Sequence, residues 1–198
     1  MKSRGFTLIE ILIALVIITG AIAVVSAFGL DIAQFGTQLS SRIEGGIELE
    51  LTMRVMLTEV RSMGPGENGA YAIATATDTE FSFFTDVDND GTFEQVRYFL
   101  DGTILKKGII EPEGTEPPTY LPQNEDVTEV AHYIVPGAIF TYYPEGYAPE
   151  MTPLPGPIDV SNIRMVTVSA TTDQDPLEPP LPATLSINIT IRNLRGEI

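Results

Sequence analysis

The sequence predicts an α+β protein in which a long amino-terminal helix packs on an antiparallel β-sheet domain with proline-rich loops. Three observations support this fold class. Residues 6–30 are almost wholly apolar, residues 31–63 continue with apolar side chains at helical spacing, and short alternating or aromatic runs follow from residue 81 onward. We therefore expect an amino-terminal leader at residues 1–5, a transmembrane helix at 6–30, an amphipathic helical half at 31–63 and a globular β-rich domain at 64–198.

The apolar segment at residues 6–30 is long enough to cross a membrane. As a helix rising about 1.5 Å per residue it would reach roughly 37 Å, against a bilayer core of about 30 Å. Lys2 and Arg4 precede the segment and Asp31 follows it. Under the positive-inside rule, this distribution predicts a single-pass protein with a cytoplasmic amino terminus and its carboxyl-terminal domain outside.

A cleaved secretory signal is the alternative interpretation of this segment. It would use the basic start, the apolar stretch and a small-residue site at Val25-Ser26-Ala27. Glu10 argues against this alternative, because a carboxylate within a membrane is energetically unfavourable and is usually functional. A disposable signal has no need of such a residue.

Residues 31–63 predict an amphipathic helix whose apolar face packs against the sheet. Gly45-Gly46 is expected to form a kink or a weak point, and Gly64-Pro65-Gly66 is expected to end the helix. The apolar residues recur largely at four-residue steps. The expected face comprises Ile32, Leu39, Ile43, Ile47, Leu51, Val55, Met56, Val60 and Met63.

The remaining chain predicts strands separated by acidic or proline-rich loops. Residues 81–84 and 95–100 flank an Asp/Asn/Gly turn, which indicates a hairpin, and residues 103–106 could add a third strand. The last two expected strands, 163–170 and 185–191, form an antiparallel pair. Further strands are expected at 130–135 and 138–143, and loops at 111–123, 144–157 and 173–182.

Composition limits the function classes. The net charge of -16 disfavours nucleic-acid binding, and the absence of cysteine excludes disulfides and thiolate metal sites. His132 is the only histidine and is expected to be structural. Because the sequence lacks a nucleophile elbow, a phosphate loop and a histidine-based metal motif, we expect no catalytic residues and no enzyme activity.

The acidic segment from Asp86 to Glu94 has the sequence DVDNDGTFE. Carboxylates at alternating positions before a glycine can converge on Ca²⁺, which takes six to eight oxygen ligands. Arg97 stands where a complete EF-hand loop has a bidentate Glu, and a plain hairpin turn is the alternative interpretation. The expected calcium ligands are Asp86, Asp88, Asp90, the Thr92 carbonyl and Glu94.

The amino terminus resembles the prepilin cleavage and methylation motif of type IV pilins and type II secretion pseudopilins. The matching residues are Gly5-Phe6-Thr7-Leu8-Ile9-Glu10, after a short charged leader. The resemblance implies cleavage between Gly5 and Phe6 by a prepilin peptidase, followed by N-methylation of Phe6. It also implies that Glu10 acts in subunit assembly, by pairing with the amine of a neighbouring subunit.

Parts of the later chain resemble the PilW/GspJ branch of this family. These parts are residues 83–91, 96–100, 140–143 and 189–194. The branch implies a minor pilin or pseudopilin that primes or caps a type IV pilus or a type II secretion pseudopilus, with other pilins as partners and the bacterial inner membrane as its location before assembly. A major pilin and an exported, membrane-anchored adhesin are the alternatives.

Overall fold

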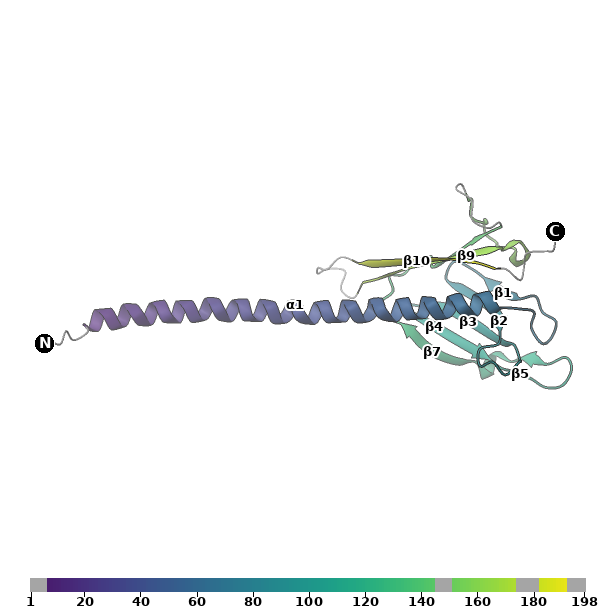
Figure 1. The fold of residues 1–198 in the computed structure, drawn as a ribbon, viewed down its shortest axis with the longest axis horizontal. Helices are drawn as coiled ribbons and strands as arrows, with labels where there is room; N and C mark the ends of the chain where they lie inside the picture. Colours follow the sequence, from purple (N-terminus) through teal and green to yellow (C-terminus); the bar gives the residue numbers. More distant parts are fainter. Residues whose placement is uncertain (1–6, 145–150, 174–181, 192–198) are drawn as a thin grey trace. The chain divides into compact units, whose positions relative to one another are not determined.

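The computed structural model describes residues 7–144, 151–173 and 182–191, with the side chains of residues 30–45 left out of this description. The chain divides into two compact units, Met1–Ser41 and Arg42–Ile198. Figure 1 follows the chain from α1 through the strands. The predicted processing residues Gly5 and Phe6 lie outside the described residues.

Helix α1 spans Leu8–Ser62. The helical backbone continues through Gly45 and Gly46. A helical glycine costs about 1 kcal/mol relative to alanine, and the hydrogen-bonded ladder of a long helix accommodates two of them. The expected kink or weak point at this pair stays a prediction. The helix ends at Ser62, with one residue between it and Gly64-Pro65-Gly66, close to the end that the sequence predicts.

The buried face of α1 in the second unit differs from the predicted face. The sequence assigns Ile47, Leu51 and Val55 to the packed face, and this is wrong, because their exposed fractions are 50%, 58% and 50%. Strict four-residue steps rotate away from a fixed direction, whereas alternating steps of four and three keep side chains on one face. The apolar residues that this part of the helix buries are Leu49, Met53, Met56 and Val60, and Met63, directly after the helix, is buried as well.

The larger sheet is antiparallel and has the order β1-β2-β3-β4-β7. Its hairpin, β2 at Glu80–Thr85 and β3 at Glu94–Asp101, confirms the prediction. Strand β4 at Ile104–Ile110 is longer than expected, and β1 at Ile73–Ala76 was missed by the sequence patterns. Strand β7 spans Asp126–Ala131.

Strand β7 ends earlier than the predicted run at residues 130–135. Tyr133 has a φ of 59°, in the left-handed region that a continuing strand cannot adopt. Beyond that point, Ile134 forms an isolated bridge to Thr172 in place of a continued strand. The prediction of a strand through residue 135 is therefore wrong.

The smaller sheet has the order β10-β9-β8. Its strands are β8 at Phe140–Tyr143, β9 at Met165–Thr172 and β10 at Ala183–Thr190. The expected terminal pair is confirmed, with Ala183 opposite Thr172 and Thr190 opposite Met165. The predicted loop at 111–123 holds a short ribbon, β5 at Pro112–Glu113 with β6 at Thr119–Tyr120, and a 3₁₀ turn at Pro122–Asn124. A second 3₁₀ turn spans Val160–Asn162.

The two sheets and the last turns of α1 share one hydrophobic core. The Phe81 ring lies 5.0 Å from the Phe83 ring in its own strand and 5.6 Å from the Tyr142 ring of β8, measured between centroids. Thr52 on α1 donates a hydrogen bond to the Val130 carbonyl of β7. Figure 1 shows these last turns of α1 running alongside the larger sheet. The architecture is α+β with a long apolar helix and antiparallel sheets, as predicted.

Candidate functional site

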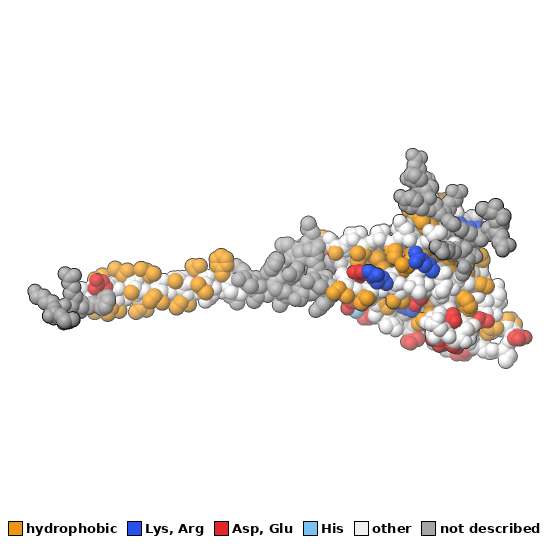
Figure 2. All heavy atoms as spheres, viewed as in Figure 1, with side chains coloured by type: hydrophobic (Ala, Val, Ile, Leu, Met, Phe, Trp, Pro, Cys, Tyr) orange, Lys and Arg blue, Asp and Glu red, His pale blue; other side chains and the backbone are white. Residues whose placement is uncertain are grey.

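The amino-terminal part of α1 is the first functional feature. The segment Leu8–Gly29 comprises 22 residues and is long and apolar enough to cross a membrane, and none of its most apolar stretch is buried. Figure 2 shows hydrophobic side chains along the visible face of this segment. Signal sequences meet the same criterion of length and composition. The residues at the start of the segment must therefore distinguish a membrane-spanning helix from a cleaved signal sequence.

Thr7 and Glu10 form a capping box at the start of α1. The Thr7 N–H and hydroxyl both donate to Glu10 Oε2, at 2.8 and 2.9 Å, and the Glu10 N–H approaches Thr7 Oγ1 at 3.4 Å. Such reciprocal bonds satisfy backbone donors that the first helical turn leaves free. Sequence analysis missed the role of Thr7, although a Thr followed three residues later by Glu before an apolar run signals this motif. Glu10 therefore has a structural task in its own chain.

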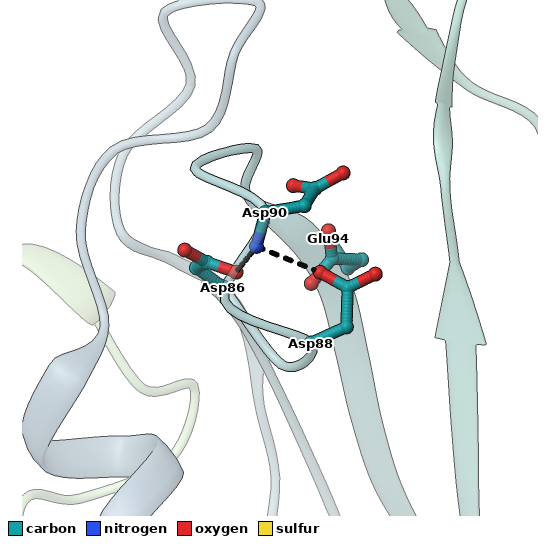
Figure 3. Close-up of side chains that lie close together, drawn as sticks. All are labelled: Asp86, Asp88, Asp90 and Glu94. Carbon is teal, nitrogen blue, oxygen red and sulfur yellow. Dashed lines mark hydrogen bonds between the residues drawn. The ribbon is translucent and has the colours of Figure 1, made fainter.

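The acidic loop between β2 and β3 is the second feature, and it belongs to the second unit. Asp86, Asp88, Asp90 and Glu94 each place one carboxylate oxygen so that all four oxygens lie within 4.8 Å of one another. Figure 3 shows the three aspartates around the tight turn, with Glu94 at the start of β3. Four of the five predicted calcium ligands thus lie together. Thr92 donates its N–H to Asp90 Oδ1 at 2.7 Å, and the part expected of its carbonyl stays a prediction.

The backbone of this loop is shaped by its own side chains. The Asp90 N–H lies 3.1 Å from both Asp86 Oδ1 and Asp88 Oδ1, and the Gly91 N–H donates to Asp86 Oδ2 at 3.0 Å. Asn89 and Gly91 have φ values of 63° and 94°. Asn tolerates the left-handed region better than most residues, and Gly adopts it without steric cost. The sequence Asn-Asp-Gly therefore turns the chain so that the aspartates converge.

Glu94 differs from the aspartates because it is buried, with an exposed fraction of 1%. Its Oε2 accepts a hydrogen bond of 2.6 Å from the Val87 N–H, but its Oε1 is buried without any hydrogen-bond partner. Burial raises the pKa of Glu94, and the charges of Glu111 and Asp88 raise it further. Burial likewise raises the pKa of Glu111, with contributions from Asp88 and Asp90. The site therefore concentrates negative charge around a desolvated carboxylate.

The loop is fastened to two other parts of the second unit through Phe93. The Phe93 N–H donates to Glu67 Oε1 at 3.1 Å, in the segment that follows α1. The Tyr120 hydroxyl of β6 donates to the Phe93 carbonyl at 2.6 Å and accepts from the Glu67 N–H at 3.0 Å. The position of the acidic loop is thus coupled to the segment after the helix and to the β5–β6 ribbon.

His132 lies away from the acidic loop in contacts of its own. Its ring nitrogens lie 3.1 Å from a Glu48 oxygen on α1 and 3.2 Å from a Glu129 oxygen on β7. These hydrogen bonds raise the pKa of His132, Glu48 first and Glu129 second. These contacts of His132 join the helix to the edge strand of the larger sheet, so they stabilise the packing of the second unit.

Comparison with known proteins places a family motif on the amino terminus. The family model described as "Prokaryotic N-terminal methylation motif" matches residues 1–28. No curated protein matches the chain. The motif implies processing by a prepilin peptidase and assembly with other pilins, and the apolar helical segment at Leu8–Gly29 fits a membrane-anchored, single-pass protein. The prepilin motif and this helix together support a type IV pilin-like family for the chain.

Proposed function

We propose that this protein is a minor pilin or pseudopilin, a structural subunit that primes or caps a type IV pilus or a type II secretion pseudopilus. The observation that carries the proposal is the methylation motif at residues 1–28, which includes nearly all of the exposed apolar segment Leu8–Gly29. Before assembly the subunit stays in the bacterial inner membrane, with its amino terminus in the cytoplasm and the second unit outside. Lys2 and Arg4 before the apolar segment support this orientation.

Processing defines the mature amino terminus in this proposal. A prepilin peptidase cleaves between Gly5 and Phe6, and Phe6 is then N-methylated. The resulting amine and the Glu10 carboxylate are both unfavourable in lipid, so pairing between neighbouring subunits offsets part of that cost. Glu10 then sets how an incoming subunit sits beside its neighbour.

An exposed apolar stripe on α1 supports a role in assembly. Ile47, Leu51 and Val55 recur every four residues and are each at least half exposed. Side chains four residues apart lie on one side of a helix, so these three form a continuous apolar strip. Contiguous exposed apolar surface is typical of protein interfaces, and a second pilin helix is the partner that a filament supplies.

The PilW/GspJ branch is the finer part of the proposal. Its supporting segments include the β2–β3 hairpin and strand β8, which both belong to the sheets of the second unit. A minor subunit of this branch would be present at the start or tip of the filament rather than along its whole length. Its abundance relative to other pilins in purified filaments distinguishes it from a major pilin.

The capping box makes a sharp test of Glu10 possible. Glu10→Ala removes both the charge and the cap, Glu10→Gln removes the charge but keeps a side chain that can cap, and Thr7→Ala removes the partner of the cap while leaving the charge. We expect all three variants to be processed by a prepilin peptidase. Incorporation into filaments should fall for both Glu10 variants and persist for Thr7→Ala.

The measurement is the amount of each processed variant in sheared filaments relative to the membrane fraction. If Glu10→Gln assembles like the wild type while Thr7→Ala fails, the cap rather than the charge governs assembly. If all three assemble normally, the assembly role proposed for Glu10 is wrong.

A further inference from the structure

We propose that the loop between β2 and β3 binds one Ca²⁺ ion through Asp86, Asp88, Asp90 and Glu94. The site uses residues of the second unit only, so a test of calcium binding does not depend on whether the protein assembles into a filament. Its effect would be structural, because the described contacts of the loop lead to the segment after α1 and to β6.

The buried Glu94 carboxylate is the observation that separates this loop from a plain acidic turn. A hairpin turn needs only Asn89-Asp90-Gly91, and nothing in that task requires a carboxylate beneath it. Glu94 Oε1 is nevertheless enclosed without a hydrogen-bond partner, an arrangement that is destabilising and rare in folded proteins. A cation held between Glu94 and the aspartates would supply the missing partner.

The spacing of the oxygens fits calcium. Ca²⁺ binds oxygen at about 2.3–2.6 Å, so two ligands on opposite sides of one ion lie roughly 5 Å apart. The four carboxylate oxygens lie within 4.8 Å of one another, so one calcium sphere accommodates every pair. Mg²⁺ binds at about 2.0–2.1 Å in near-ideal octahedral geometry, which brings opposite ligands to roughly 4.2 Å and demands stricter placement. We therefore assign the site to Ca²⁺.

The hydrogen bonds within the loop leave room for an ion. A carboxylate has about four lone-pair directions, and the backbone N–H groups use only some of those on Asp86, Asp88 and Asp90. The same N–H groups hold the side chains in fixed orientations before an ion arrives. Backbone carbonyls, such as that of Thr92, and water would complete a shell of six to eight oxygens.

The charge of the loop also favours a cation. Among the ion pairs that the described part of the chain forms, none involves Asp86, Asp88, Asp90 or Glu94. Glu111 adds a further negative charge close to Asp88 and Asp90. Like charges at this spacing repel one another, and a divalent ion removes that repulsion.

The first test is calcium binding by the full-length chain in detergent after removal of metals with EDTA. Isothermal titration with CaCl₂ should give one site with a dissociation constant of about 10⁻⁴ M or tighter, within the range of known protein calcium loops. Thermal unfolding is followed by near-ultraviolet circular dichroism of the seven tyrosines, since the chain has no tryptophan. Saturating CaCl₂ should raise Tm by roughly 5 °C, and MgCl₂ at equal ionic strength should raise it by less than half as much.

Three variants locate the ion. Glu94→Gln keeps the shape of the buried side chain, Asp88→Asn changes an exposed ligand with little risk to folding, and Glu50→Gln removes one exposed carboxylate of α1 as the matched control. We expect the first two to weaken calcium binding at least tenfold and to lose the rise in Tm, while Glu50→Gln keeps both.

Two results would overturn the proposal. One is a wild-type Tm that responds to CaCl₂ no more than to MgCl₂ at equal ionic strength. The other is undiminished calcium binding by both Asp88→Asn and Glu94→Gln, which would place the ion elsewhere. The Asp88→Asn arm remains decisive if Glu94→Gln fails to fold.

Discussion

The Tyr98 hydroxyl of β3 donates a hydrogen bond of 2.7 Å to Glu59 Oε2 of α1. Both residues are buried, and Lys107 of β4 donates to the other oxygen of the same carboxylate. Burial raises the pKa of Tyr98, and the Glu59 charge raises it further, so the phenol remains a neutral donor. One carboxylate of the helix is thereby bound by two adjacent strands of the larger sheet.

Removal of Glu59 should destabilise the second unit. Glu59→Ala leaves the ammonium group of Lys107, whose side chain is only 12% exposed, without its partner, and we expect a loss of about 3 kcal/mol in the free energy of unfolding. Tyr98→Phe removes one hydrogen bond and should cost about 1 kcal/mol. Urea unfolding in detergent measures both. Glu50→Ala, which breaks an exposed pair with Arg54 on the same helix, is the control and should change stability by less than about 0.5 kcal/mol.

The two faces of α1 should respond differently to substitution. Met56 is fully buried, so Met56→Ala should destabilise the protein by about 3 kcal/mol. Leu51 is 58% exposed, so Leu51→Ser should change stability by less than about 0.5 kcal/mol. If the stripe of Ile47, Leu51 and Val55 packs against another pilin, Leu51→Ser should nevertheless reduce filament incorporation. Normal incorporation of Leu51→Ser would remove the stripe from the assembly interface.

Gly108 should be intolerant of a side chain. Arg97 on β3 forms a two-bond contact with Glu125, at 2.8 and 2.7 Å, and Gly108 on β4 is the register partner of Arg97. A Cβ added at Gly108 would lie 1.9 Å from Glu125 Oε1 and 2.5 Å from its Cδ, so the whole carboxylate would have to move. We expect Gly108→Ala to destabilise by about as much as Glu125→Ala, and the double variant to add little. Additive losses would show that the two positions are independent.

His132 should make stability depend on pH near neutrality. Its pKa is raised in the folded protein by hydrogen bonds to Glu48 and then Glu129. A raised pKa means that the protonated form is favoured by folding, so the contribution is complete below the unfolded pKa of about 6.5 and is lost as pH rises through the folded value. The stability difference between wild type and His132→Gln should therefore shrink from about pH 6 to about pH 9. A difference that grows over this range would contradict the assignment.

Most of the strands could be located from the sequence because their positions are marked by local residue patterns. Aromatic and β-branched residues beside Asn-Asp-Gly gave the β2–β3 hairpin, and alternation gave the terminal β9–β10 pair. Strand β1 was missed because Ile73–Ala76 is only four residues long and follows a loop without a distinctive pattern. The end of β7 depends on the backbone of Tyr133, which no residue pattern announces.

The candidate sites likewise have features that the sequence predicts and features that only the folded chain determines. The spacing of Asp86, Asp88, Asp90 and Glu94 along the sequence was enough to predict that their carboxylates lie close together, since a tight turn makes alternate side chains converge. That Glu94 is buried with an unpaired oxygen depends on the packing of β3 against neighbouring strands, which sequence spacing does not encode. The buried face of α1 was misassigned for a related reason, because apolar residues occupy two sides of the helix and only the sheet decides which side is covered.

The most direct test of the central claim is the mass of the amino-terminal peptide after co-expression with a prepilin peptidase. A chain that begins at N-methylated Phe6 is the predicted result, since Gly5 and Phe6 stand at the processing position of the matched motif. Cleavage near Ala27 instead would identify an ordinary secretory signal. The membrane segment and the role of Glu10 in assembly would then both be lost, and the proposed pilin function with them.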